Sequence, residues 1–333
     1  MKYAILGSGS KANSYVFSNG NASCIVDNGY SFTEFLSRNK SLNFEIDKFK
    51  FILVTHTHKD HINGVKTCAK KLKIPIFIHK NSDYLQYFNK ERLDIRPIET
   101  NKIYKCDSFS FISFETFHDA KGSISYSLNF DNTTFTIITD TGKISRQMIK
   151  YARYSDILFL EANYNIDALN NGPYPYHLKK RIKSNYGHLS NIKSIEFLNF
   201  LSSKDSKIKL VYFCHLSDVN NSIKLLEQDI SKYGQFNFNY IICPRNQIQI
   251  GIDLKTINQL VSNNIDLFQK NIDNNYKDNN NIDDSGIDNK SNYNNNIDDS
   301  EIDNKGNYNN NTDNNKIGNN EKIYSKYSKN LLF

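Results

Sequence analysis

Three histidines and one aspartate fall within six residues, directly after a short apolar run. The run Phe51–Val54 leads into His56, His58, Asp60 and His61. Side chains two positions apart on an extended segment point the same way, so we expect the rings of His56 and His58 to face one point. The chain has only 8 histidines, and this concentration predicts a metal site rather than isolated core or surface histidines.

Imidazole and carboxylate ligands suit zinc, with manganese or iron as alternatives. Four groups from one loop cannot complete the coordination of two ions, so further ligands must come from elsewhere. His118, Asp140 and His215 each stand at or just past the end of an apolar run, and we predict that they complete the set. His79 and His177 lack such a setting, and we expect them to be structural or surface residues. The set predicts a metal-dependent hydrolase with two metal ions.

Short β-branched and aromatic runs alternate with helical stretches and end at these polar residues. The predicted strands are Lys2–Leu6, Ser23–Val26, Phe51–Val54, Phe109–Phe117, Thr134–Thr139, Ile157–Leu160 and Ile208–Phe213. The predicted helices are Gly64–Leu72, Ile144–Tyr151, Leu178–Asn185 and Asn191–Ser202. Runs this apolar are typical of strands buried on both faces. The pattern predicts an α/β layered fold with its site on one rim.

The composition changes in the last quarter of the chain. From about Asn263 the sequence is dominated by Asn, Asp, Lys, Ser and Tyr, and the fifteen residues Asn281–Asn295 recur with two differences as Asn296–Asn310. Such a segment has too little apolar surface to offset its ordering entropy. We therefore predict a catalytic domain over residues 1–255 and a disordered tail over residues 256–333.

The charge is divided unevenly between these two parts. The tail from Ile265 has 8 Lys against 12 Asp and Glu, which leaves 34 basic and 23 acidic residues before it, a balance of +11. A catalytic domain this basic suits a polyanion such as nucleic acid. A generally lysine-rich composition is the alternative explanation.

The cysteines indicate a reducing, cytoplasmic setting. The chain has 5 cysteines and no CxxC pair, which argues against a disulfide framework or a zinc finger. Met1–Ser10 contains no apolar stretch long enough for a signal peptide. A membrane span needs a run of about 18 apolar residues, and the sequence has none, so we predict no membrane partner.

The HxHxDH pattern after an apolar strand resembles the metallo-β-lactamase superfamily. The resemblance implies a four-layer αββα sandwich, in which two facing sheets are covered by helices and a dinuclear site lies at one edge. It also implies an aspartate early in the chain, matched by Asp27, that does not bind metal but orients the metal ligands by hydrogen bonding. The implied ligands are His56, His58 and His118 for the first metal, Asp60, His61 and His215 for the second, and Asp140 as the bridge.

Longer motifs narrow the resemblance to the YycJ/WalJ nuclease branch. They extend over roughly Lys2 to Ile252, although Asn28 follows Asp27 where a small residue is commoner, and the Asn-rich tail is no family feature. Proteins of that branch act as DNA exonucleases, so the resemblance implies phosphodiester hydrolysis. The motifs are Gly7–Ser14, Glu161–Tyr164, Gly172–Pro175 with Leu178–Ile182, Gly187–Asn191 and Leu216–Asn221.

Two metals suit in-line displacement at phosphorus, with a bridging hydroxide as nucleophile and Asp60 to orient its proton. The leaving oxygen needs a proton donor, and His188 is the candidate, because related phosphodiesterases of the superfamily place a non-ligand histidine in this role. The alternative is that His188 merely caps the following helix, for which Ser190 or Asn191 is the expected N-cap.

A basic helix precedes this histidine. Leu178, Ile182 and Tyr186 recur at spacing four, so the helix can bury one face and present cations on the other. We predict that Lys179, Lys180, Arg181 and Asn191 bind phosphate, although a solvated cationic face is the alternative. Tyr164, Tyr174 and Tyr176 are weaker candidates for stacking on bases.

The sequence thus favours a DNA exonuclease. A phosphodiesterase of small cyclic or nucleotide substrates, a thioester or lactam hydrolase with the same dinuclear site, and a metal-bound scaffold are the alternatives. The complete ligand set argues against the scaffold, and the basic charge favours a polymer, DNA ahead of RNA. Metal identity, cleavage polarity and oligomeric state stay open.

Overall fold

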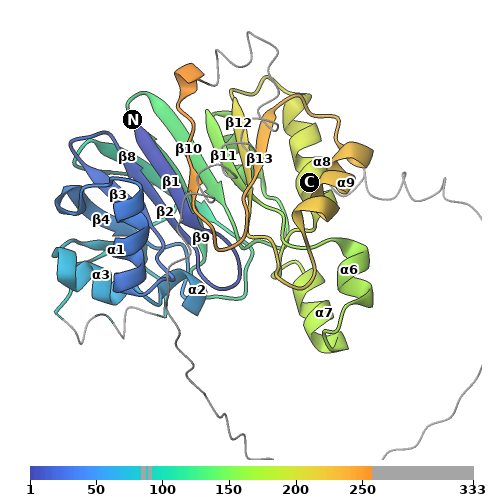
Figure 1. Cartoon of the computed structure of the whole chain (residues 1–333), viewed down its shortest axis with the longest axis horizontal. Coiled ribbons are helices and arrows are strands. Elements are labelled where there is room, and N and C mark those ends of the chain that lie inside the picture. Colours follow the sequence, from blue (N-terminus) through green and yellow to red (C-terminus); the bar gives the residue numbers. More distant parts are fainter. Residues whose placement is uncertain (84–87, 89–91, 257–333) are drawn as a thin grey trace, which may run out of the picture. The chain divides into compact units, whose positions relative to one another are not determined.

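Two facing sheets form the centre of the molecule (Figure 1). The computed structural model describes residues 1–83, 88 and 92–256. Apart from Thr256, the predicted tail therefore lies outside the described residues. Within the described part each sheet has seven strands, in the orders β14-β1-β2-β3-β4-β5-β6 and β13-β12-β11-β10-β9-β8-β7.

Strands of the first sheet come mostly from the N-terminal third of the chain. Neighbouring strands are parallel from β3 to β6. The pairs β14–β1, β1–β2 and β2–β3 are antiparallel. The bounds are β1 (Lys2–Gly7), β2 (Ser14–Ser18), β3 (Ser23–Val26), β4 (Phe49–Leu53), β5 (Ile76–His79), β6 (Ile95–Ile98) and β14 (Gln249–Ile250).

The second sheet has the same mixed character. Its strands are parallel from β10 to β13 and antiparallel from β7 to β10. The bounds are β7 (Ile103–Cys106), β8 (Phe109–Glu115), β9 (Ile124–Phe130), β10 (Thr133–Ile138), β11 (Ile157–Glu161), β12 (Leu210–Cys214) and β13 (Asn239–Ile242).

Helices cover the outer face of each sheet (Figure 1). Apolar residues of α1 and α3 pack on the first sheet, and those of α5, α8 and α9 pack on the second. The predicted αββα sandwich is therefore confirmed. The helices are α1 (Phe32–Ser41), α2 (Lys59–Ile62), α3 (Val65–Leu72), α5 (Arg146–Arg153), α6 (Ile166–Asn171), α7 (Tyr176–Lys183), α8 (Asn191–Ser202) and α9 (Ile223–Tyr233), with a 3-10 turn at Ile46–Lys48.

Strand β11 shows why the apolar runs are continuous. Ile157 and Phe159 point between the sheets, whereas Leu158 and Leu160 point into the core beneath the helices. Side chains alternate along a strand, so a strand covered on both faces is apolar at every position. The ring of Phe159 is 5.6 Å from that of Tyr15 in the facing sheet, centroid to centroid. Aromatic contacts of this kind join the two sheets.

One of the three residues predicted to form the apolar face of the basic helix lies outside that helix. Leu178 and Ile182 pack with Tyr164 and Leu169, as the spacing requires. However, α7 ends at Lys183 and its C-cap Ser184 is extended, so Tyr186 leaves the helical register. Its side chain is 57% exposed.

Several strands end at one edge of the sandwich, where the ligand candidates follow. Asp27 comes after β3, Asp140 after β10 and His215 after β12. The carboxyl ends of parallel strands meet at one edge of a sheet, which is where sites form in such folds. No helix in the described residues has the length and apolarity to cross a membrane.

Candidate active site

Three imidazole nitrogens converge at the edge of the first sheet. His58 Nδ1 lies 3.2 Å from His56 Nε2 and 3.1 Å from His118 Nε2. A single hydrogen on His58 Nδ1 cannot be donated to both of the other nitrogens. A tetrahedral zinc ion with Zn–N bonds of about 2.0–2.1 Å would hold its nitrogen ligands about 3.3 Å apart. The triangle therefore fits a metal ion.

A second group lies beside the first and contains carboxylates. Asp60, His61 and His215 form it, and Asp140 stands between the groups. Asp140 Oδ2 lies 3.1 Å from His61 Nε2, and Asp140 Oδ1 lies 3.5 Å from His215 Nε2 and 3.7 Å from His118 Nε2. Asp140 thus touches both groups, the position expected of a bridging ligand.

Two atoms of this group lack partners. Asp140 Oδ2 and His215 Nε2 are buried and form no hydrogen bond of acceptable geometry, even though His61 is close to the former. Leaving a buried polar atom unsatisfied is costly, and such atoms in native proteins usually have an explanation. Both atoms face the cluster, so the donor set fits a divalent cation.

The outer nitrogens of the rings are held by the protein. His61 Nδ1 is 2.8 Å from Asp27 Oδ2, His215 Nδ1 is 3.0 Å from Glu161 Oε1, and His118 Nδ1 is 3.0 Å from the Gly187 carbonyl oxygen. His56 Nδ1 is 3.0 Å from Thr55 Oγ1, whose own hydroxyl donates to Asp27. Acceptors in these places fix the orientation of each ring, so that its Nε2 faces the cluster.

Backbone conformation helps to aim these side chains. Asp27, Asp140 and His215 have φ values of 55°, 55° and 58°. Residues other than glycine rarely adopt this left-handed region, and such strain concentrates at functional sites. Gly64 allows the backbone at Tyr30 to approach closely, because a Cβ there would lie 1.8 Å from the Tyr30 carbonyl oxygen.

The electrostatic environment differs between the two groups. Burial lowers the pKa of His56, His58 and His118, so these rings are neutral with free lone pairs. Burial also opposes charge on His61, but Asp140 and Asp27 raise its pKa well above the usual range. In the same way Asp140, against the effect of burial, raises the pKa of His215. The second group therefore presents carboxylates that attract positive charge.

Glu161 has a place in the site that sequence reasoning did not assign. It is fully buried, and its Oε1 receives both His215 Nδ1 and His188 Nδ1, the latter at 2.6 Å. Its Oε2 accepts the backbone N–H of Thr141 at 3.0 Å. The sequence does contain one indication that Glu161 belongs to the site. The predicted strand Ile157–Leu160 ends at this glutamate, just as other predicted strands end at ligand candidates.

The loop Gly7–Ser14 also enters the site. The Asn13 amide donates to Asp60 Oδ2 at 3.1 Å, and Ser8 Oγ accepts the backbone N–H of His215 at 2.7 Å. The sequence motif was recognised, but nothing in it predicted these contacts across the fold.

His188 lies beside Asp140 at the cluster. Its side chain is 18% exposed and its Nδ1 is 3.6 Å from Asp140 Oδ1. It does not cap the following helix, since Ser190 is the N-cap of α8 and its Oγ accepts the backbone N–H of Lys193. The capping interpretation of His188 is therefore wrong, whereas Ser190 as the N-cap is confirmed.

The predicted phosphate-binding residues fall into two kinds. Lys179, Lys180 and Arg181 lie on α7, where Arg181 pairs with Asp119, the residue after His118. Asn191, in contrast, is fully buried, and its amide donates to Asp229 Oδ2 at 2.8 Å and to Asn221. The prediction for Asn191 is wrong, because its polar atoms are used inside the protein.

Among the tyrosines proposed for stacking, Tyr164 is buried and cannot meet a base, whereas Tyr176 is 80% exposed.

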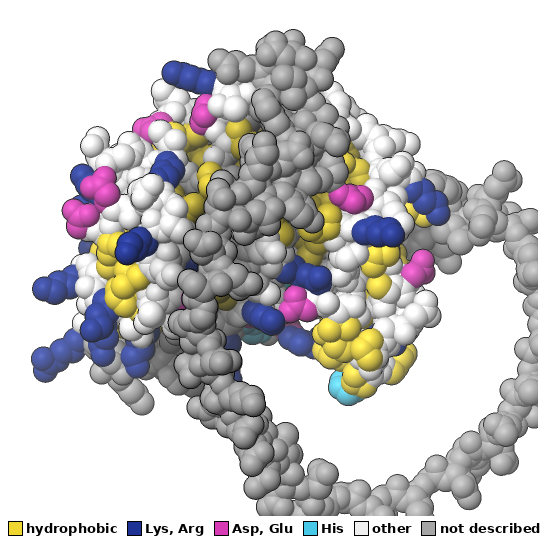
Figure 2. Space-filling view, in the orientation of Figure 1, with side chains coloured by type: hydrophobic (Ala, Val, Ile, Leu, Met, Phe, Trp, Pro, Cys, Tyr) yellow, Lys and Arg dark blue, Asp and Glu magenta, His cyan; other side chains and the backbone are white. Residues whose placement is uncertain are grey.

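Lys and Arg side chains lie over both halves of the face seen in Figure 2. This distribution accords with the basic charge of the described domain.

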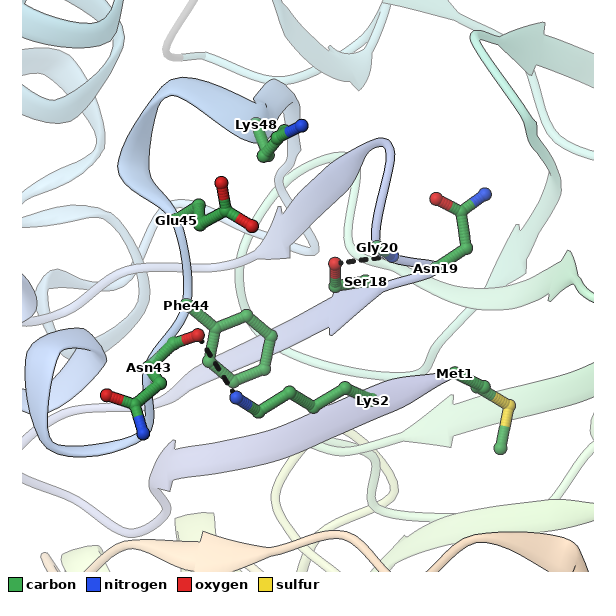
Figure 3. Close-up of a pocket in the computed structure, with 9 residues that line it drawn as sticks. All are labelled: Met1, Lys2, Ser18, Asn19, Gly20, Asn43, Phe44, Glu45 and Lys48. Carbon is green, nitrogen blue, oxygen red and sulfur yellow. Dashed lines mark hydrogen bonds between the residues drawn. The ribbon is translucent and has the colours of Figure 1, made fainter.

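A separate pocket lies near the start of β1, at the other end of that strand from the Gly7–Ser14 loop (Figure 3). Lys2 crosses it, with Nζ 4.7 Å from the centre of the Phe44 ring and 3.1 Å from the Asn43 carbonyl oxygen. The lysine is thus already paired. No candidate ligand of the cluster lines this pocket.

The sandwich and the two-group cluster define a hydrolase of the metallo-β-lactamase type. A family model described as "Beta-lactamase superfamily domain" matches residues 25–215. The chain belongs to this superfamily and is a hydrolytic enzyme.

His79 and His177 stay outside the candidate metal groups of the described residues.

Two curated relatives and one solved structure extend this assignment. The chain is 32% identical over 230 residues to exodeoxyribonuclease WalJ of Streptococcus pneumoniae, covering 66% of this chain and 83% of the relative. It is 29% identical over 242 residues to exodeoxyribonuclease YycJ of Bacillus anthracis, covering 70% and 88%. The metallo-β-lactamase fold protein YhfI of Bacillus subtilis superposes with a TM-score of 0.57 at 16% identity, over 75% of this chain and 98% of that one. The predicted family is thereby confirmed.

The contacts of Glu161 generate a prediction. We expect Glu161→Gln to weaken divalent metal binding about 10- to 100-fold, because the side chain loses its negative charge and one acceptor oxygen becomes an NH2 group, which cannot accept the N–H groups that Glu161 now satisfies. Metal titration by calorimetry measures this directly. Glu227→Gln on α9 is the control, and equal metal affinity in both variants would contradict the role of Glu161.

Proposed function

We propose that this chain is a metal-dependent exonuclease that hydrolyses phosphodiester bonds of DNA. The observation that carries the proposal is the position of His188, a partly exposed histidine held by Glu161 at the edge of the two-group cluster. An acid beside paired metal sites suits a reaction that expels an alkoxide, such as phosphodiester hydrolysis. The two curated relatives, both exodeoxyribonucleases, support DNA as the substrate.

The proposed cofactors are two divalent ions, with zinc as the first choice and manganese as the alternative. When bound, such ions lower the pKa of a water ligand and neutralise charge on phosphoryl oxygens. The proposed ligands are His56, His58 and His118 for one ion, Asp60, His61 and His215 for the other, and Asp140 for both.

The proposed role of Asp60 is to orient a proton of the attacking water. Burial opposes its ionisation, but His61 and His215 lower the pKa of this carboxyl far below the usual range. It is partly exposed, and the Asn13 amide fixes one of its oxygens. Asp60 is therefore ionised and oriented before substrate arrives.

His188 is the proposed acid for the leaving oxygen. Its Nδ1 contacts a glutamate that is fully buried and whose pKa, against the effect of burial, is lowered by His188 itself. This contact occupies Nδ1 and orients the ring, so the other ring nitrogen is the one that would donate the proton.

Basic residues of α7 are the proposed contacts to the DNA backbone. Lys180 is exposed, and no ion pair or hydrogen bond of its side chain is found in the described residues, so its charge is available. Lys179 donates to the Asn170 carbonyl oxygen and Arg181 to Asp119, so each would have to exchange a partner for phosphate. We therefore expect Lys180 to contribute most.

The substrate proposal is tested with end-labelled duplex DNA, single-stranded DNA, RNA, a cyclic dinucleotide and a thioester. We expect shortening of DNA from an end, and little hydrolysis of the others. His58→Ala should abolish it, because one nitrogen of the triangle is lost, whereas His177→Ala on the exposed part of α7 should not. Preferential hydrolysis of the cyclic dinucleotide or the thioester would replace the proposal with that activity.

The role of His188 predicts a dependence on the leaving group. With DNA, His188→Gln should lower kcat about 10²- to 10⁴-fold. With a p-nitrophenyl phosphodiester the loss should be much smaller, since nitrophenolate departs without a proton. Metal content and melting temperature serve as controls. Equal losses on both substrates would show that His188 does not act as the acid.

The role of Lys180 predicts a change in salt dependence. Each phosphate contact contributes about 0.7 to 0.9 to the slope of log K against log salt, so Lys180→Gln should reduce the slope by about that amount. DNA binding measured without divalent metal between low and moderate salt gives the slope. Lys48→Gln, in the 3-10 turn before β4 and beside the separate pocket, should leave it unchanged. An unaltered slope in Lys180→Gln would remove this lysine from the DNA contact.

A further inference from the structure

An exposed aromatic ring lies beside the cluster and has no part in the mechanism above. Tyr186 is 57% exposed, and its ring centre is 6.3 Å from that of Phe117 at an angle of 60°. Lys143 Nζ lies 3.9 Å from the centre of the Phe117 ring. Three segments of the chain thus place two aromatic rings and one cation in contact.

The same three residues adjoin the proposed catalytic groups in sequence and in space. Tyr186 is two residues before His188, and the Gly187 carbonyl between them accepts His118 Nδ1. Phe117 precedes His118, and its carbonyl oxygen accepts the backbone N–H of Gly142 at 2.9 Å. The rings therefore stand at the rim of the cluster, on the backbone that carries it.

The segment that bears Tyr186 is closely fitted. A Cβ at Gly187 would lie 2.2 Å from the Ile182 carbonyl oxygen, and one at Gly142 would lie 2.2 Å from the Ser184 carbonyl oxygen. The backbone N–H groups of Tyr186 and Gly187 both donate to Ser184, at 3.2 and 3.0 Å. The backbone that bears the ring is thus already ordered, so a ligand need not order this segment when it binds.

We propose that Tyr186, with Phe117 and Lys143, forms a subsite that stacks the nucleobase next to the scissile phosphodiester. Every base has a flat π face, so an exposed ring binds bases irrespective of their sequence, as a nuclease without sequence preference requires. Lys143 adds a positive charge suited to the adjoining phosphate. The subsite rests on the proposed function and specifies which part of the DNA the enzyme holds.

The test compares oligonucleotides that do and do not carry a base at the cleaved end. One ends in 2-aminopurine, whose fluorescence falls when it stacks, and the other ends in an abasic tetrahydrofuran residue. Binding is measured in EDTA, so that no cleavage occurs, and KM is measured separately with metal. Tyr186→Ala removes the ring, and Tyr186→Phe keeps it.

Tyr154→Ala is the matched control. Tyr154 is 55% exposed and also lies near cations, Arg153 and Lys207. However, it follows the C-terminal end of α5, next to the start of β10 and away from the edge that holds Asp140. Its removal should change neither measurement.

We expect Tyr186→Ala to weaken binding of the natural end and to raise its KM by about five-fold or more, which is the usual effect of losing a stacked ring. The 2-aminopurine quenching should disappear, the abasic end should bind as before, and Tyr186→Phe should match the unaltered protein. Equal losses on natural and abasic ends, or no loss at all, would overturn the subsite. An unaltered protein that quenches 2-aminopurine but cuts no DNA would contradict the proposed function and leave the subsite standing.

Discussion

Hydrogen bonds to the outer ring nitrogens of the histidines determine the arrangement at the edge of this sandwich. Asp27 holds His61 from the end of β3, and Glu161 holds His215 from the end of β11. Each sheet thus contributes one fully buried carboxylate that faces one ligand candidate. Burying a carboxylate is costly unless its oxygens are satisfied, and both residues receive several donors. If either hydrogen bond were lost, the ring in front of it could turn and the cluster would lose its geometry.

The two halves of the cluster meet at Asp140, so their relative position matters. Asp140 follows β10 of the second sheet, yet its Oδ2 lies 3.1 Å from Nε2 of His61, which lies in α2 after β4 of the first sheet. The aromatic core between the sheets, including the contact between Tyr15 and Phe159, fixes how the sheets face one another. Protein interiors are densely packed, so a change in this core would be transmitted to the distances at the edge.

Much of the site was predictable because its signals are local. The run His56–His61 is contiguous, and His118, Asp140 and His215 follow apolar strands that reveal themselves by composition. The sequence marks Glu161 as a strand end and as the start of the motif Glu161–Tyr164, but it does not reveal its role, because that role depends on rings that come 27 and 54 residues later.

The errors have the same origin. The Asn191 amide donates to Asp229 inside the protein, so it is not available to phosphate. Tyr186 lies outside the helix because α7 ends at Lys183. Neither outcome is visible in helical spacing. Three of the predicted helices recur with ends shifted by one or two residues, as α3, α5 and α7, and the fourth matches α8 at both ends. Polar or short strands such as β7 and β14 have no clear apolar pattern in the sequence.

The order of the ligands along the chain has a consequence for biosynthesis. The N-terminal loop is made first, but Ser8 accepts the backbone N–H of His215, which is separated from it by 207 residues. The short strand β14, still later, pairs with β1. A nascent chain that has not yet released His215 from the ribosome can hold at most part of the cluster. This hydrolytic enzyme is thus kept without its complete cluster until its translation has passed that histidine.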